Sequence, residues 1–121
     1  MKSITGQIVF LYYEDLAAPR EFYGSILGLN SYFEQDWVTL YRITQTAAIG
    51  IVKPGHAPAP AASGVMVSIS SDVVDEWYSR LRENPSVKIL KKIYDHPEVP
   101  IRAFLIEDPG GYSIEFFQWL N

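Results

Sequence analysis

The sequence predicts an α+β fold made of two βαβββ modules. Three observations predict it. A strand, a helix and three short strands follow one another twice along the chain. A stretch rich in proline and alanine, residues 53–64, separates the two copies, and an Asp-Pro-Gly-Gly turn at residues 108–111 precedes the last strand. Two copies of one pattern in a single chain indicate an internal duplication.

The first module begins with residues 7–13, whose β-branched and aromatic side chains are typical of a strand. A helix is expected over residues 16–27. Pro19 lies in its first turn, where a missing N–H costs little, and Gly28 follows its end. Three strands are then expected over residues 30–35, 37–42 and 46–52.

The second module repeats this order, beginning with a strand at residues 65–70. Its helix is expected over residues 73–82, with Ser71 or Asp72 as the cap and Asn84-Pro85 as the stop. The apolar residues of this helix follow the spacing i, i+3, i+4 and i+7, which places on one face Val74, Trp77, Tyr78 and Leu81. Three strands are expected over residues 87–93, 100–107 and 112–118. The modules therefore span residues 1–53 and 65–121, joined by a linker at 54–64.

Composition excludes several classes of protein. The 121 residues include 14 acidic and 10 basic ones, which give a net charge of −4, and no basic cluster typical of a nucleic-acid surface occurs. The absence of cysteine excludes disulfides and thiolate metal sites. No apolar run approaches the roughly 18 residues of a membrane span, and residues 1–7 do not resemble a signal peptide. We expect a soluble cytoplasmic protein that binds neither nucleic acid nor membranes.

Two motifs resemble signatures of a known family. Asp15-Leu16, Phe22-Tyr23 and residues 27–29 are similar to the first-module signature of the vicinal oxygen chelate superfamily, and residues 107–116 are similar to its closing signature. That superfamily includes glyoxalase I, fosfomycin-resistance proteins, extradiol dioxygenases and bleomycin-binding proteins. The resemblance implies that the two modules form a curled mixed sheet around a cavity, and that the protein is a homodimer.

Metal-dependent members of that family hold a divalent ion with histidine and carboxylate ligands. Of the matching positions, Glu115 retains a carboxylate, whereas Ile8, Met66 and Gly50 occupy the others. A shift by one residue would bring Gln7 forward, but it would also reverse the faces of the strand. We therefore expect no cofactor, with a divalent metal held by atypical ligands as the alternative.

Glu115 is the candidate catalytic or anchoring residue. Strand alternation places it on one face with Ser113 and Phe117, opposite Ile114 and Phe116. A solvated carboxylate is one interpretation of this position. The family resemblance favours the other, a carboxylate that points into the cavity and acts as a hydrogen-bond acceptor or general base.

Aromatic and apolar side chains supply the remaining candidate ligand contacts, together with one histidine: Tyr12, Phe10, Trp37, Tyr41, Met66, Phe117 and His56. Phe10 is expected to pack in the core rather than to contact a ligand, whereas either role is compatible with Tyr12. Trp37 and Tyr41 are expected either on a concave ligand-binding face or, in the other interpretation, as exposed hairpin aromatics or dimer contacts. His56 and His96 fall in loops, where a solvated histidine is the simplest interpretation and a lid over the cavity is the other. Arg102 fits a structural salt bridge better than a ligand contact.

Three functions are compatible with these residues. The leading one is a glyoxalase/bleomycin-resistance-like protein that binds a small apolar or aromatic molecule in the cavity without a full metal site. The second is a lyase/isomerase or dioxygenase-like enzyme in which Glu115 serves as general base or metal ligand. The third is a dimerisation module without a ligand.

Overall fold

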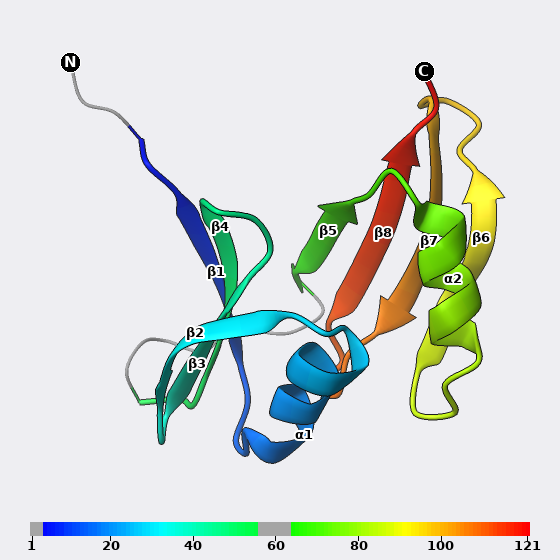
Figure 1. The fold of residues 1–121 in the computed structure, drawn as a ribbon. Coiled ribbons are helices and arrows are strands. Elements are labelled where there is room, and N and C mark those ends of the chain that lie inside the picture. Colours follow the sequence, from blue (N-terminus) through cyan, green and yellow to red (C-terminus); the bar gives the residue numbers. More distant parts are fainter. Residues whose placement is uncertain (1–3, 56–63) are drawn as a thin grey trace. The chain divides into compact units, whose positions relative to one another are not determined.

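The computed structural model describes residues 4–55 and 64–121. It divides into two compact units, unit 1 at Met1–Pro60 and unit 2 at Ala61–Asn121 (Figure 1). Each unit holds one four-stranded mixed sheet with a helical segment between its first and second strands, as the duplicated pattern predicts. Within the described residues, no helix is long and apolar enough to cross a membrane.

Unit 1 has the strand order β1-β4-β3-β2, in which β1 pairs parallel with β4 and the other neighbours are antiparallel. Its elements follow the predicted boundaries within two residues in the strands: β1 Gln7–Tyr12, α1 Ala17–Arg20, η1 Glu21–Ile26, β2 Asn30–Gln35, β3 Val38–Arg42 and β4 Ala47–Val52. Gly28 ends the helical segment with φ of 73°, a left-handed conformation that favours glycine.

The helix of unit 1 is not a regular α-helix over its whole length. It begins as α1 and continues as a π-helical segment, η1, where the N–H of Leu27 bonds to the carbonyl of Phe22. The wider turn buries both Phe22 and Tyr23. Gly24 faces Tyr41 across this contact, and a Cβ at Gly24 would lie 3.5 Å from the Tyr41 hydroxyl. The helical segment therefore packs closely on one face of the sheet, which leaves the other face without a helix.

Unit 2 has the strand order β5-β8-β7-β6, again with its first and last strands paired in parallel. Its elements lie close to the predicted ranges: β5 Met66–Ser70, α2 Val74–Arg82, β6 Lys88–Asp95, β7 Ile101–Glu107 and β8 Ser113–Trp119. Helix α2 lies against the sheet (Figure 1). The ring of Trp77 stacks on Phe116 with centroids 4.9 Å apart, and Tyr78 lies 5.1 Å from Phe104. The predicted apolar stripe is thus the face that packs on the sheet.

The start of α2 differs from the prediction. Val73 occupies the N-cap position, and no side-chain cap is present. The Ser71 hydroxyl accepts the N–H of Val73 instead, while Gln118 on β8 accepts the N–H of Val74 at 3.1 Å. The side chain of Gln118, on β8, therefore accepts a helix N-terminal N–H for which the sequence predicted a cap from Ser71 or Asp72.

The turn before β8 is held by a buried carboxylate. Asp108 is 3% exposed, and its Oδ1 accepts the backbone N–H groups of Gly110 and Tyr112, each at 2.9 Å. Gly111 has φ of 87°, which a side chain would strain. This turn directs the chain into β8, the strand that carries Glu115.

Candidate functional site

One face of the unit 1 sheet carries no helix, and we call it the open face of unit 1. Strand register places on it Ile8, Phe10 and Tyr12 of β1, Leu40 of β3, and Gly50 and Val52 of β4. Leu11, the neighbour of Phe10 on the opposite face, is fully buried. Phe10 is 42% exposed and Ile8 41%. The expectation that Phe10 packs in the core is therefore wrong, because the helix covers the alternate residues of β1.

Gly50 allows the Phe10 side chain to lie across the open face. A Cβ at Gly50 would come within 2.6 Å of the Phe10 ring and 2.9 Å of Leu40 Cδ2. The Phe10 ring therefore covers Gly50, the position that the family resemblance relates to a metal ligand. Phe10 and Leu40 form an apolar surface there.

Tyr41 lies on the helix side of the sheet. It is 4% exposed, its ring is 6.1 Å from that of Tyr23, and its hydroxyl donates to the carbonyl of Arg20 at 3.5 Å. Burial raises the pKa of Tyr41, the Glu34 carboxylate raises it further, and Arg20 partly opposes both. Tyr41 is a core residue, so its expected place on a ligand-binding face is wrong.

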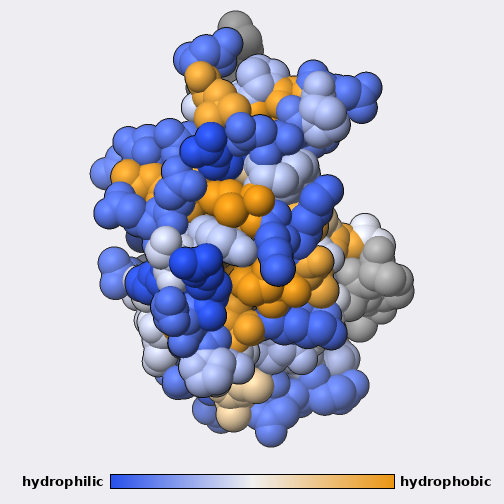
Figure 2. All heavy atoms as spheres, turned by 90° about the vertical axis from the view of Figure 1, so that its right-hand side faces the viewer, coloured by the Kyte–Doolittle hydropathy of each residue, from blue (hydrophilic) through white to orange (hydrophobic). Residues whose placement is uncertain are grey.

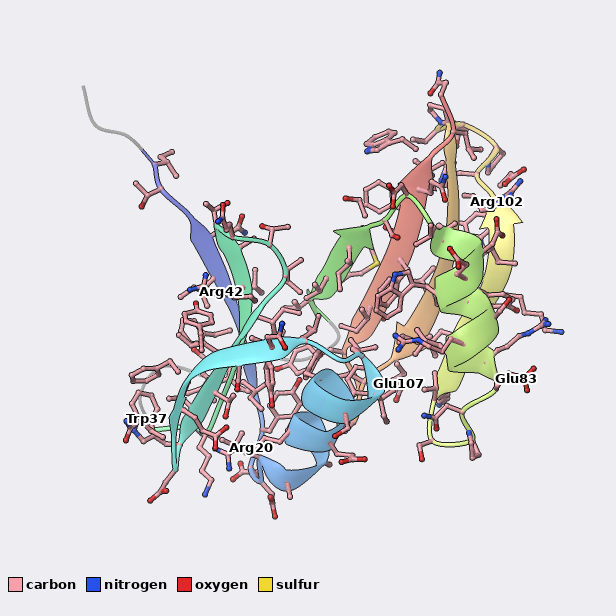
Figure 3. The ribbon with its side chains drawn as sticks, viewed as in Figure 1. Arg20, Trp37, Arg42, Glu83, Arg102 and Glu107 are labelled. Atoms are coloured by element: carbon pink, nitrogen blue, oxygen red, sulfur yellow. The ribbon has the colours of Figure 1, made fainter. Side chains whose placement is uncertain are left out.

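Trp37 occupies the turn between β2 and β3 and is 37% exposed (Figure 3). Trp37 therefore precedes β3, which begins at Val38. This position agrees with the alternative interpretation of Trp37 as an exposed hairpin aromatic.

The face of the unit 2 sheet opposite α2 is likewise without a helix, and we call it the open face of unit 2. It presents Met66, Ser68 and Ser70 of β5 beside Ser113, Glu115 and Phe117 of β8. Glu115 is half-buried at its centre, and the Ser68 hydroxyl donates to Glu115 Oε1 at 2.5 Å. Met66 is 53% exposed. Alternation along β8 correctly placed Glu115 with Ser113 and Phe117, whereas Ser68 was not foreseen as its partner because the β5–β8 register was not known.

The remaining candidates play local roles or are not described. His96 Nδ1 accepts the backbone N–H groups of Glu98 and Val99, at 3.0 and 3.1 Å, so this histidine holds its own loop. Arg102 pairs with Asp95 at 2.7 Å and with Asp75 at 3.2 Å (Figure 3), which confirms the structural salt bridge. These bonds lower the pKa of Asp95 and raise that of Arg102. His56 lies outside the described residues.

The duplicated sheets, each with one helix-covered and one open face, match a known family. The family model of the Glyoxalase/Bleomycin resistance protein/Dioxygenase superfamily matches residues 5–116. The chain belongs to this superfamily. No protein with a curated description matches it.

Solved structures of the superfamily fold are similar over almost the whole chain. TnmS3, an antibiotic binding protein from Streptomyces sp. CB03234, has a TM-score of 0.79 at 18% identity, covering 98% of each chain. A glyoxalase/bleomycin resistance protein/dioxygenase from Nocardioides has a TM-score of 0.79 at 22% identity, covering 100% of this chain and 87% of that one. Lactoylglutathione lyase from Agrobacterium tumefaciens has a TM-score of 0.74 at 19% identity, covering 93% and 91%. At these identities the likeness is one of fold.

The positions that the superfamily resemblance relates to metal ligands supply few donors in this chain. Ile8 and Gly50 have no donor atom, Met66 offers a soft thioether, and only Glu115 offers a hard oxygen ligand. Over residues 4–55 and 64–121, no three side chains of histidine, cysteine, aspartate or glutamate gather closely enough to hold a metal ion. These residues do not fit the hard donor set of a divalent metal centre.

Proposed function

We propose that this superfamily member binds a small apolar or aromatic molecule on its open faces, without a full metal site. The observation that carries the proposal is the exposure of large apolar side chains on the open face of each sheet, along the first strand of each unit. Phe10 and Ile8 on unit 1 and Met66 on unit 2 are each more than 40% exposed. Covering such side chains with an apolar ligand removes their surface from water, which is favourable.

The open face of unit 2 also offers a polar anchor. Glu115 is half-buried beside Met66 and Phe117 and accepts the Ser68 hydroxyl. A carboxylate has room for more than one hydrogen bond, so Glu115 is able to accept a ligand N–H or O–H while the bond to Ser68 fixes its orientation. A few oriented polar groups on an apolar wall are typical of small-molecule sites.

Hydrophobic residues also reach the surface in several places on the side of the molecule drawn in Figure 2. Scattered exposure of this kind is normal for a protein surface. The test must therefore distinguish the open faces from the other exposed apolar residues.

A fluorescent apolar probe provides this test. N-Phenyl-1-naphthylamine is uncharged, and we expect it to bind the folded protein saturably with a rise in fluorescence. Phe10→Ser and Met66→Lys each weaken this binding if the open faces hold the probe. Val73→Lys is the matched control, because Val73 is 43% exposed but stands at the start of α2 and belongs to no strand of either sheet. Equal loss in all three variants, or no saturable binding to the native protein, would overturn the proposal. Circular dichroism confirms that each variant is folded.

A further inference from the structure

A pocket of about 430 Å³ lies within unit 1 where β1 and β4 begin. Ile8 and Ala48, which are paired neighbours on the open face, form part of its lining. Tyr32 of β2, Arg42 of β3 and Gln45 of the following turn provide further lining. The pocket therefore continues the apolar open face toward a polar end.

Arg42 is fixed in this pocket by two contacts. Its guanidinium carbon lies 4.0 Å from the centroid of the Tyr32 ring, and its Nη1 donates to the carbonyl of Gln45 at 3.0 Å (Figure 3). A guanidinium has five N–H donors, so one hydrogen bond leaves others for a ligand. Because the ring and the carbonyl already hold the side chain, less conformational freedom is lost when an anion binds.

The charge around Arg42 favours an anion. Of the described residues that line the pocket, none is an aspartate or a glutamate. Among the described residues, none of the ion pairs includes Arg42, whereas Arg102 is paired with two carboxylates. The pocket thus holds a cation without a carboxylate partner, in a protein whose net charge is −4.

The apolar side of the pocket sets the shape of the ligand. Ile8 leads along β1 to Phe10, and two residues of a strand span about 7 Å. One or two fused aromatic rings match the spacing of these two side chains, and the pocket that holds Arg42 lies at the Ile8 end. A guanidinium matches a carboxylate with two parallel N–H···O bonds.

We infer that the Arg42–Tyr32 pocket binds the carboxylate of a small aromatic acid, whose ring lies along Ile8 and Phe10. This inference names the ligand class for the open face of unit 1, and in that sense it rests on the proposed function.

The test compares two ligands that share a ring system and differ in charge. 1-Naphthoate and 1-naphthamide are each titrated against the protein with bound N-phenyl-1-naphthylamine, and displacement gives their affinities. We expect 1-naphthoate to bind about tenfold more tightly than 1-naphthamide, the effect of one partly exposed charge-assisted hydrogen-bond pair. This preference should fall as NaCl is raised, because salt screens an exposed ion pair.

Arg42→Gln removes the charge and should abolish the preference for 1-naphthoate. Arg42→Lys keeps the charge but loses the planar fork, and it should retain part of the preference. Arg80→Gln is the matched control. Arg80 also lies over an aromatic ring, 4.3 Å from the centroid of Trp77, but it belongs to α2 of unit 2.

The outcomes separate this inference from the proposed function. If N-phenyl-1-naphthylamine binds but both naphthalene ligands displace it equally, the inference is wrong and the proposed function stands. The inference is also wrong if the preference survives in Arg42→Gln or disappears equally in Arg80→Gln. If the uncharged probe itself does not bind, the proposed function fails, and the inference fails with it.

Discussion

Replacing Gly50 by alanine tests how Phe10 lies on the open face of unit 1. The added Cβ would stand 2.6 Å from the Phe10 ring, far inside the ordinary contact distance. It would also stand 2.9 Å from Leu40 Cδ2, the far end of a flexible side chain. The ring must therefore swing away from the sheet, while Leu40 needs only a small rotation.

The magnitude follows from how the ring is held. Overpacking a site costs about 1–3 kcal/mol. Phe10 is 42% exposed and is free to move toward water, so we expect Gly50→Ala to cost about 1–2 kcal/mol in the free energy of unfolding. Phe10→Ala removes a side chain that is a little more than half buried, at a cost of about 1–2 kcal/mol.

The double variant distinguishes the clash from a general effect on the strand. Once the ring is absent, Gly50→Ala should change stability by less than about 0.5 kcal/mol, because alanine is also the better strand residue. Urea unfolding at 25 °C, followed by circular dichroism with the slope m compared between variants, measures all four proteins. A coupling energy below about 0.5 kcal/mol between the two positions would refute this account of the open face.

Three further predictions concern groups away from the open faces. The raised pKa of Tyr41 means that its hydroxyl loses its proton at a lower pH in the unfolded state than in the folded one, so stability should fall as pH rises above 10.0. Tyr41→Phe should reduce that fall, as measured by urea unfolding across this range, and an equal fall in the variant would contradict the prediction. The lowered pKa of Asp95 means that its ion pair with Arg102 stabilises the protein above pH 3.8, and that this stabilisation is lost as pH falls through the lower pKa of the folded state. The difference in Tm between the native protein and Asp95→Asn should therefore shrink in acid. A difference that stays constant with pH would contradict this prediction. Asp108→Ala removes the acceptor of two backbone N–H groups and should lower the free energy of unfolding by about 2 kcal/mol, as measured by urea unfolding. A loss below about 0.5 kcal/mol would contradict this prediction and show that water replaces the carboxylate.

The element order was predictable because it depends on local patterns. Period-two alternation, the helical spacing of Val74 to Leu81 and the turn at Asp108 each act within a few residues. The π-helical segment was not predictable in this way. It is defined by backbone hydrogen bonds such as that from the N–H of Leu27 to the carbonyl of Phe22, for which the side-chain pattern of residues 21–26 contains no signal.

The faces of the strands could be predicted only in part. Alternation grouped Ile8 with Phe10 and Glu115 with Phe117 correctly. It did not show which face of β1 the helix covers, because both faces of that strand are apolar. Tyr41 was grouped with Trp37, but Trp37 belongs to the turn before β3, and the Tyr41 side chain is buried on the helix side of the sheet.

The polar parts of the candidate site depend on pairing between distant segments. Ser68 meets Glu115 only through the register of β5 against β8. Arg42 meets Tyr32 through an irregular pairing of β2 with β3, where the register shifts between Ser31 and Phe33. A single sequence contains no signal for either contact.

The parallel pairing of first and last strands in each unit has a consequence for synthesis on the ribosome. Gln7 of β1 pairs with Ala47 of β4, and Met66 of β5 with Ser113 of β8. Strand β1 therefore has no partner until β4 has been translated, and β5 has none until β8 has emerged. Contacts so distant in sequence form slowly, since the intervening chain must first be ordered. The period in which each opening strand is unpaired, with Phe10 and Met66 on it, is the time at which this protein is most open to aggregation.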